Sequence, residues 1–225
     1  MVALSLLIVA CGGVDAPTPT ATLPPTEALR DATVERLRAL SSVRFEVTHS
    51  SEGTDMGGGL VLTSVEGVAA FPDQAEMSAA GTISPAVVNF GIVQIADVTY
   101  FSGPFGDTWR IVEPGTLPFN FVAMHQSVAS AILSAEDLAV ADAGKLDGAS
   151  VVTLTGTIAS EDLRGLVPGA AEGGLLRVTT YIRRDDGLPI RVALEGPLIA
   201  ADTEAMVRHL NLSDFDAPVA IEPPL

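Results

Sequence analysis

The most regular feature of the sequence is an alternation of apolar and polar residues with a period of two. In residues 43–49, Val43, Phe45 and Val47 alternate with polar residues, which is the pattern of a half-buried β-strand. The same pattern predicts strands at residues 60–65, 75–83, 87–95, 98–101, 109–112, 138–145, 150–158, 176–182, 188–194 and 205–212. Most connections, including predicted turns at 56–59, 66–67 and 184–187, are too short for crossover helices, so we expect antiparallel pairing.

Three segments follow a helical period instead, at residues 27–40, at residues 120–134 and in a short turn that starts at Ser160. The residues expected on their inner faces are Leu29 and Leu37 in the first segment and Val128 and Ile132 in the second. We therefore predict an α+β fold with one large, curved antiparallel sheet of about ten or eleven strands. Short helices are expected to cover its concave face.

The composition does not show whether the interior of such a fold is fully packed or contains a cavity. Hydrophobic residues make up 48% of the 225 residues, but only 5% are aromatic, so the interior must be built from Val, Leu, Ile and Ala. Two outcomes follow from so few large side chains. Either the helices pack directly onto the sheet and form a dry core, or a cavity remains that admits an apolar ligand.

The first residues resemble a bacterial lipoprotein signal. Residues 1–10 form an uncharged apolar run that is too short to span a bilayer, and Ile8, Val9 and Ala10 lead directly to Cys11 in the manner of a lipobox. We predict that residues 1–10 are a signal peptide and that the Cys11 thiol receives a lipid anchor. The alternative is a free cysteine after an ordinary signal sequence. No Lys or Arg precedes Cys11, so the true start is expected upstream.

The next segment is typical of a spacer. Residues 11–26 are rich in Pro and Thr and lack apolar periodicity, which favours an extended chain between the anchor and a folded domain. We therefore expect a single domain over residues 27–225, held on the outer side of a cell membrane by Cys11.

Charge and reactive residues exclude several classes of function. The formal net charge of −16 disfavours nucleic acid as a partner, because cationic side chains supply most phosphate affinity. One cysteine and three separated histidines show no metal-ligand spacing, so we expect no metal and no cofactor. Asp185 and Asp186 fit a hairpin turn, and His125 and Ser127 lie on different faces of one helix. Catalysis is therefore not expected.

The order of segments resembles one known family. The likeness is carried by the lipobox, Trp109-Arg110, the run from Asp142 through Gly148 to Ile158, Glu161-Asp162-Leu163, Val167-Pro168, the hairpin at 178–194 and the segment 210–223. This succession is similar to the LppX/LprG family of cell-envelope lipoproteins. The resemblance implies a half-barrel like that of the LolA/LolB lipoprotein carriers, with a hydrophobic cavity that holds acyl chains of lipids or glycolipids in transit across the envelope.

The resemblance also suggests partners and a site. We expect an acylated lipid or glycolipid as ligand, a membrane transporter as a candidate partner, and a monomer. The expected cavity wall comprises Val43, Phe45, Val47, Leu60, Leu62, Val152, Leu154, Leu176, Val178, Ile182, Ile190, Val192 and Leu194 on strands, with Leu29, Leu37, Val128 and Ile132 on helices. Each could equally be an ordinary core residue. Alternative functions are a tethered interaction module with a closed core and, less favoured, a hydrolase.

Overall fold

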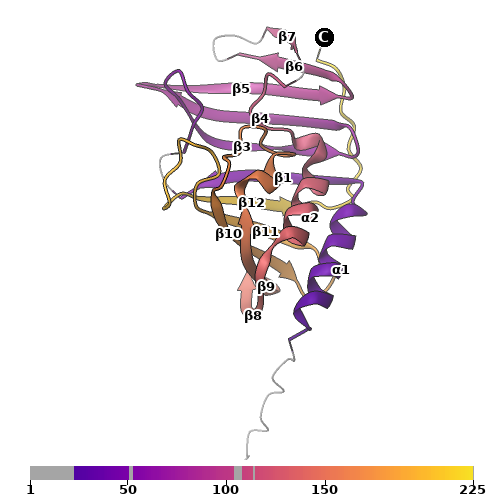
Figure 1. The fold of residues 1–225 in the computed structure, drawn as a ribbon. Helices are drawn as coiled ribbons and strands as arrows, with labels where there is room; N and C mark the ends of the chain where they lie inside the picture. The colour runs from indigo at the N-terminus through magenta and orange to yellow at the C-terminus, as the bar shows by residue number, and fades with distance from the viewer. Residues whose placement is uncertain (1–22, 51–52, 104–107, 114, 225) are drawn as a thin grey trace, which may run out of the picture.

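The computed structural model describes residues 23–50, 53–103, 108–113 and 115–224. Within these ranges the chain forms one antiparallel sheet of twelve strands, two α-helices and two short 3-10 helices (Figure 1). The strands are β1 (Ser42–His49), β2 (Thr54–Asp55), β3 (Leu60–Ala70), β4 (Gln74–Ile83), β5 (Ala86–Ile95), β6 (Val98–Ser102), β7 (Trp109–Val112), β8 (Glu136–Leu146), β9 (Ala149–Ala159), β10 (Leu175–Arg183), β11 (Pro189–Glu195) and β12 (Val207–Ser213). The helices are α1 (Thr26–Arg38), η1 (Phe121–Ala123), α2 (Met124–Ser134) and η2 (Ser160–Leu163).

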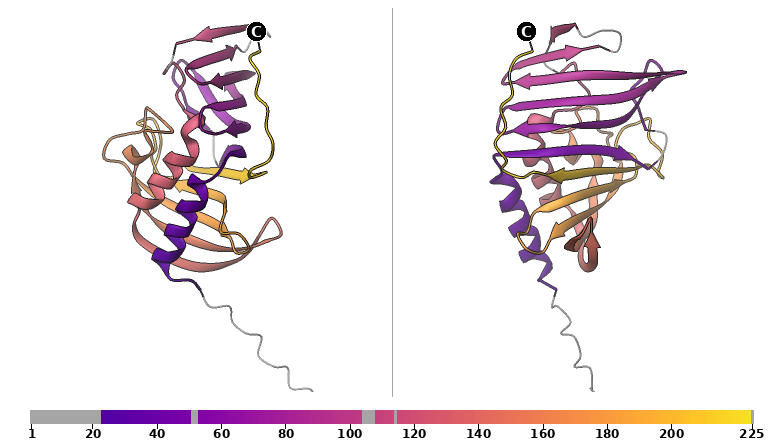
Figure 2. Two further views of the ribbon diagram at one scale, coloured as in Figure 1. Left: turned by 90° about the vertical axis from the view of Figure 1, so that its right-hand side faces the viewer. Right: turned by 180° about the vertical axis from the view of Figure 1, so that it is seen from behind.

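The strand order shows an open sheet. It runs β7-β6-β5-β4-β3-β1-β12-β11-β10-β9-β8, and the short β2 pairs with β3. The last strand, β12, lies between β1 and β11 and so joins the two halves of the sheet. The sheet curves, and α1 and α2 lie together against one face (Figure 2). The predicted antiparallel, open and helix-covered sheet is confirmed.

The two helices form a small layer of their own. Leu37 of α1 is almost fully buried, and α2 buries Met124, Val128 and Ile132. The helices contact each other as well as the sheet, and their apolar residues join one continuous core. This arrangement follows from their amphipathic spacing, because each helix must bury one stripe and no second sheet is present among the described residues.

Three details differ from the sequence-based expectation. The described residues form twelve strands rather than ten or eleven, because the two-residue β2 has no periodicity that a pattern could detect. The third helix is a single turn of 3-10 helix. Residues 66–67 do not form a turn, because β3 continues through them to Ala70.

Gly67 explains the error at that turn. It lies in the middle of β3, opposite Phe45 of β1 and Met77 of β4. A β-carbon at this position would lie 2.3 Å from the backbone oxygen of Glu76 and 2.7 Å from the Cβ of Met77. The glycine therefore permits a close approach between central strands rather than a change of direction.

Replacing Gly67 is accordingly expected to destabilise the sheet. We predict that Gly67→Ala lowers the free energy of unfolding by about 2 kcal/mol, since the added methyl group overpacks a rigid interior. Gly103→Ala is the matched control, because its β-carbon would meet only Phe101 at an ordinary 3.6 Å. Urea unfolding followed by circular dichroism measures both variants. Equal stability of the two variants would contradict this interpretation of Gly67.

Candidate functional site

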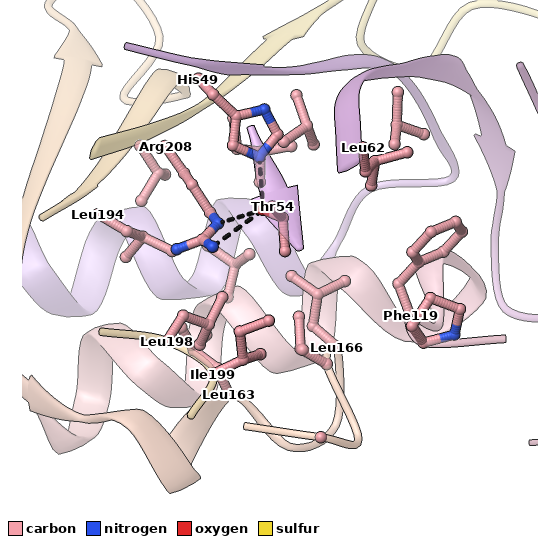
Figure 3. A pocket seen from close by; sticks show the side chains of 18 of the residues that line it. His49, Thr54, Leu62, Phe119, Leu163, Leu166, Leu194, Leu198, Ile199 and Arg208 are labelled. Atoms are coloured by element: carbon pink, nitrogen blue, oxygen red, sulfur yellow. Dashed lines mark hydrogen bonds between the residues drawn. The ribbon is translucent and has the colours of Figure 1, made fainter. Parts of the chain in front are cut away.

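An apolar cavity of about 290 Å³ lies between the concave face of the sheet and α2 (Figure 3). Its wall combines strand residues such as Val47 and Val178 with Val128 and Ile132 from α2. The wall also includes Asp55 of β2, which is an exposed residue. The volume is near the lower limit of typical small-molecule sites, which hold roughly 300–1,000 Å³.

A second apolar cavity of about 220 Å³ adjoins the first. The two share Met56, Leu62, Pro118 and Phe119 as a common wall. Phe90, Ile92 and Phe101 line the second cavity on the side of β5 and β6. The concave face therefore carries apolar space on both sides of Phe119, extending across several strands.

About half of the residues expected in the cavity wall lie there. Val47, Leu62, Val128, Ile132, Val178, Val192 and Leu194 line the first cavity, and Leu60 and Leu62 line the second. The expected residues that the structure places in the packed core instead are Leu29, Leu37, Val43, Phe45, Val152, Leu154, Leu176 and Ile182. Helix coverage explains several of these, because α1 and α2 pack onto β9, which carries Val152 and Leu154.

Ile190 also lies outside both cavity walls, for a different reason. The β10–β11 register shifts at this point, so that Tyr181 faces Arg191 while Ile182 faces Pro189. The extra residue on β11 is Ile190, which is left partly exposed. A β-bulge breaks the period of two on which the expectation rested.

Sequence patterns did not identify the wall residues that lie outside strands and long helices. Phe119 and Phe121 come from the segment before α2, Leu163 and Leu166 from η2 and the turn after it, and Leu198 from the loop after β11. The ring of Phe121 stacks on Phe45 with centroids 4.4 Å apart. In the sequence these residues are marked only by their apolar character. Because they lie in irregular segments, that character does not show which way their side chains point.

A polar cluster is set into the otherwise aliphatic wall of the first cavity. Arg208 of β12, which is 6% exposed, donates from Nε and Nη2 to the hydroxyl oxygen of Thr54, at 3.1 and 2.9 Å. Its Nη2 also donates to Oδ1 of Asp202 at 2.6 Å. His49 Nε2 lies 2.8 Å from the same Thr54 hydroxyl, so this hydroxyl connects β2 with β12 and β1 (Figure 3).

The hydrogen bonds determine the protonation of His49. The Thr54 oxygen accepts two bonds from Arg208, so its own proton is directed to Nε2 of His49. The proton of a neutral His49 then resides on Nδ1, which donates to the carbonyl oxygen of Thr63 at 2.9 Å. Burial lowers the pKa of His49 from its ordinary value of 6.5, against the bond to Thr63, which raises it. His49 is therefore neutral at pH 7.

Two of the remaining sequence candidates make contacts that stabilise the fold. His125 packs against the ring of Phe71, and Asp186 forms an ion pair with Arg183 in the hairpin turn. In this part of the chain no three His, Cys, Asp or Glu residues are placed to hold a metal ion. None of the described helices is both long and apolar enough to span a bilayer. Cys11 and residues 1–22 lie outside the described residues.

A comparison with protein families assigns the chain. The model of the LppX_LprAFG lipoprotein family matches residues 24–221. The chain belongs to this family. The match covers the whole described fold from α1 past β12, so the family predicted from the order of segments is confirmed, and with it a place among cell-envelope lipoproteins. No curated protein matches the chain in sequence.

Two solved structures have a similar fold. The crystal structure of LprF from Mycobacterium bovis is 16% identical and has a TM-score of 0.68, with 88% of this chain and 96% of that chain covered. The crystal structure of the lipoprotein LppX from Mycobacterium tuberculosis is 17% identical, with a TM-score of 0.58 over 88% of this chain and 100% of that one. At these identities the likeness establishes the fold.

The proton position in the polar cluster is directly measurable. We predict that His49 is the Nδ1–H tautomer at pH 7 and titrates below 6.5 in the folded protein, while in urea its pKa returns to about 6.5. The unfolded chain then binds more protons between the two pKa values, so this group's contribution to stability falls as pH drops through that interval. Nitrogen-15 NMR of the imidazole ring checks both points. An Nε2–H tautomer would contradict the hydrogen-bond assignment.

Proposed function

We propose that this protein is a lipid-anchored envelope lipoprotein that binds acyl chains in its cavity and carries lipids across the envelope. The observation that supports the proposal is the aliphatic cavity of about 290 Å³ between sheet and helices, with the second cavity beside it. A core closed by its own side chains would leave no such space, which argues against a purely structural module.

The energetics of transfer favour this kind of wall. Each methylene removed from water contributes about 0.8 kcal/mol, so a sixteen-carbon chain represents roughly 12 kcal/mol. A lipid leaves its membrane at a useful rate only where a protein offsets most of the free energy of exposing its acyl chain to water. Val, Leu and Ile side chains do so without directional contacts, so chains of different length are tolerated.

The adjoining cavities supply room for more than one segment of hydrocarbon. Their shared wall contains Met56 and Phe119, both partly exposed, with side chains that turn about only a few bonds. Rotation of these side chains would connect the two spaces. One long acyl chain would then extend from the first space into the second along the same concave face.

The rest of the proposal concerns how the domain reaches its membrane. Cys11 would carry the lipid anchor and the residues between it and the start of α1 at Thr26 would form the spacer, with the domain on the extracytoplasmic side of the cell membrane. The net charge of −16 repels an anionic leaflet and limits non-specific adhesion of the domain. The protein would act as a monomer, with all the described lining residues supplied by one chain. A membrane transporter would supply or accept the lipid.

A cavity-filling substitution tests the proposal. Val47 lines the first cavity and is only partly buried, so Val47→Trp places an indole ring in free space. We predict at least tenfold less uptake of pyrene-labelled dipalmitoylphosphatidylcholine from vesicles, because the ring occupies the volume that the acyl chain needs. Pyrene fluorescence measures the uptake.

Val87→Trp is the matched control. Val87 is 74% exposed on β5, so the same substitution there adds a ring outside both cavities and should leave uptake unchanged. Thermal unfolding of both variants verifies that they are folded. Normal uptake by a folded Val47→Trp protein would refute the cavity as the acyl-chain site.

A further inference from the structure

Arg208 keeps two hydrogen-bond donors unused inside the cavity wall. A guanidinium group has five N–H bonds. Its Nε–H and the two N–H bonds of Nη2 are directed to Thr54 and Asp202. Nη1 is fully buried and has no hydrogen-bond partner among the described residues.

A buried Nη1 group without an acceptor destabilises the folded protein unless a ligand supplies one. A buried donor without an acceptor loses its hydration and gains nothing in return. Arg208 lines the first cavity, and its guanidinium group extends from β12 toward Thr54 at the cavity wall (Figure 3). Nη1 itself exposes almost no surface in this structure, so an oxygen atom of a cavity ligand reaches it only when neighbouring side chains of the wall move aside.

The surrounding charges define which kind of oxygen fits. Asp202, whose side chain is 1% exposed, balances the charge of Arg208. Its Oδ2 accepts the backbone N–H groups of Leu198 and Ile199, both at 2.9 Å, so this carboxylate is held in place. His49 is neutral in its hydrogen-bond arrangement, and Asp55 adds a further negative charge at the cavity wall. The positive charge of Arg208 is thus already balanced, and the cluster has no net positive charge with which to bind an anion.

We propose that Arg208 Nη1 donates to a neutral carbonyl oxygen of the bound lipid, as found in the ester that joins an acyl chain to its head group. This inference rests on the proposed acyl-chain function and adds selectivity to it. The cavity prefers acyl esters to ether-linked chains, which lack the carbonyl, and to free fatty acids, whose carboxylate would bring an unbalanced negative charge into a buried site. Arg208 is then a specificity-determining residue.

Matched lipids test the inference on the unaltered protein. Dipalmitoylglycerol and dihexadecylglycerol, its ether-linked analogue, have equal chains and the same free hydroxyl but differ in the carbonyl groups. Each is offered in phosphatidylcholine vesicles, and the bound lipid is quantified by mass spectrometry after re-isolation of the protein. We expect the ester to bind about tenfold more tightly than the ether, because the lost bond involves a charged donor. Methyl palmitate should likewise exceed palmitate at neutral pH.

A double variant locates the preference at Arg208. Arg208→Gln combined with Asp202→Asn removes both charges together, so no uncompensated ion is left in the wall. Glutamine is too short to replace Nη1, and the ester-to-ether ratio should therefore fall to about one. Arg191→Gln is the control, since Arg191 bonds Asn211 and Asp147 outside the cavity wall and should keep the wild-type ratio.

The outcomes separate this inference from the proposed function. Equal binding of ester and ether by the wild-type protein would overturn the role of Arg208 while leaving acyl-chain binding intact. Tighter binding of palmitate than of its methyl ester would show that the cluster accepts an anion and would also overturn it. Binding of none of these lipids would refute the function itself. If the double variant fails to unfold cooperatively, the wild-type ratios alone decide.

Discussion

The structure depends on a mismatch between the area of its sheet and the size of its helices. With strands about 4.8 Å apart, the main path of the sheet is roughly 50 Å wide, whereas each helix is only about 10–12 Å across. The 13-residue α1 and the 11-residue α2 are about 20 and 16 Å long and pack against each other, so together they cover less than half of that width. Much of the concave face is therefore left without a helix above it.

The uncovered part of the concave face is only partly filled by other side chains. Phe119, Phe121 and the residues around η2 cover part of the face from irregular segments, yet cavities of about 290 and 220 Å³ persist beside them. In a protein with 5% aromatic residues, few side chains are large enough to fill such a gap. The polar cluster around the buried Arg208–Asp202 pair interrupts a wall that is otherwise mostly apolar.

Sequence reasoning recovered the fold better than the site, and the reason is physical. Alternation shows which residues of a strand face inward, so Val43 and Val47 of β1 were assigned to one face. It contains no information on what lies above that face: Val43 is in the packed core, whereas Val47 lines the cavity. The polar cluster was undetectable for a related reason, because Thr54, His49 and Arg208 meet only through the pairing of β2 with β3 and of β1 with β12.

The central claim is that the concave face shelters a lipid, and native mass spectrometry of the protein isolated from a bacterial envelope tests it most directly. The account predicts a folded species whose mass exceeds that of the polypeptide and its anchor by one acylated lipid, released on unfolding. A folded protein with no added mass, before and after incubation with envelope lipids, would contradict it.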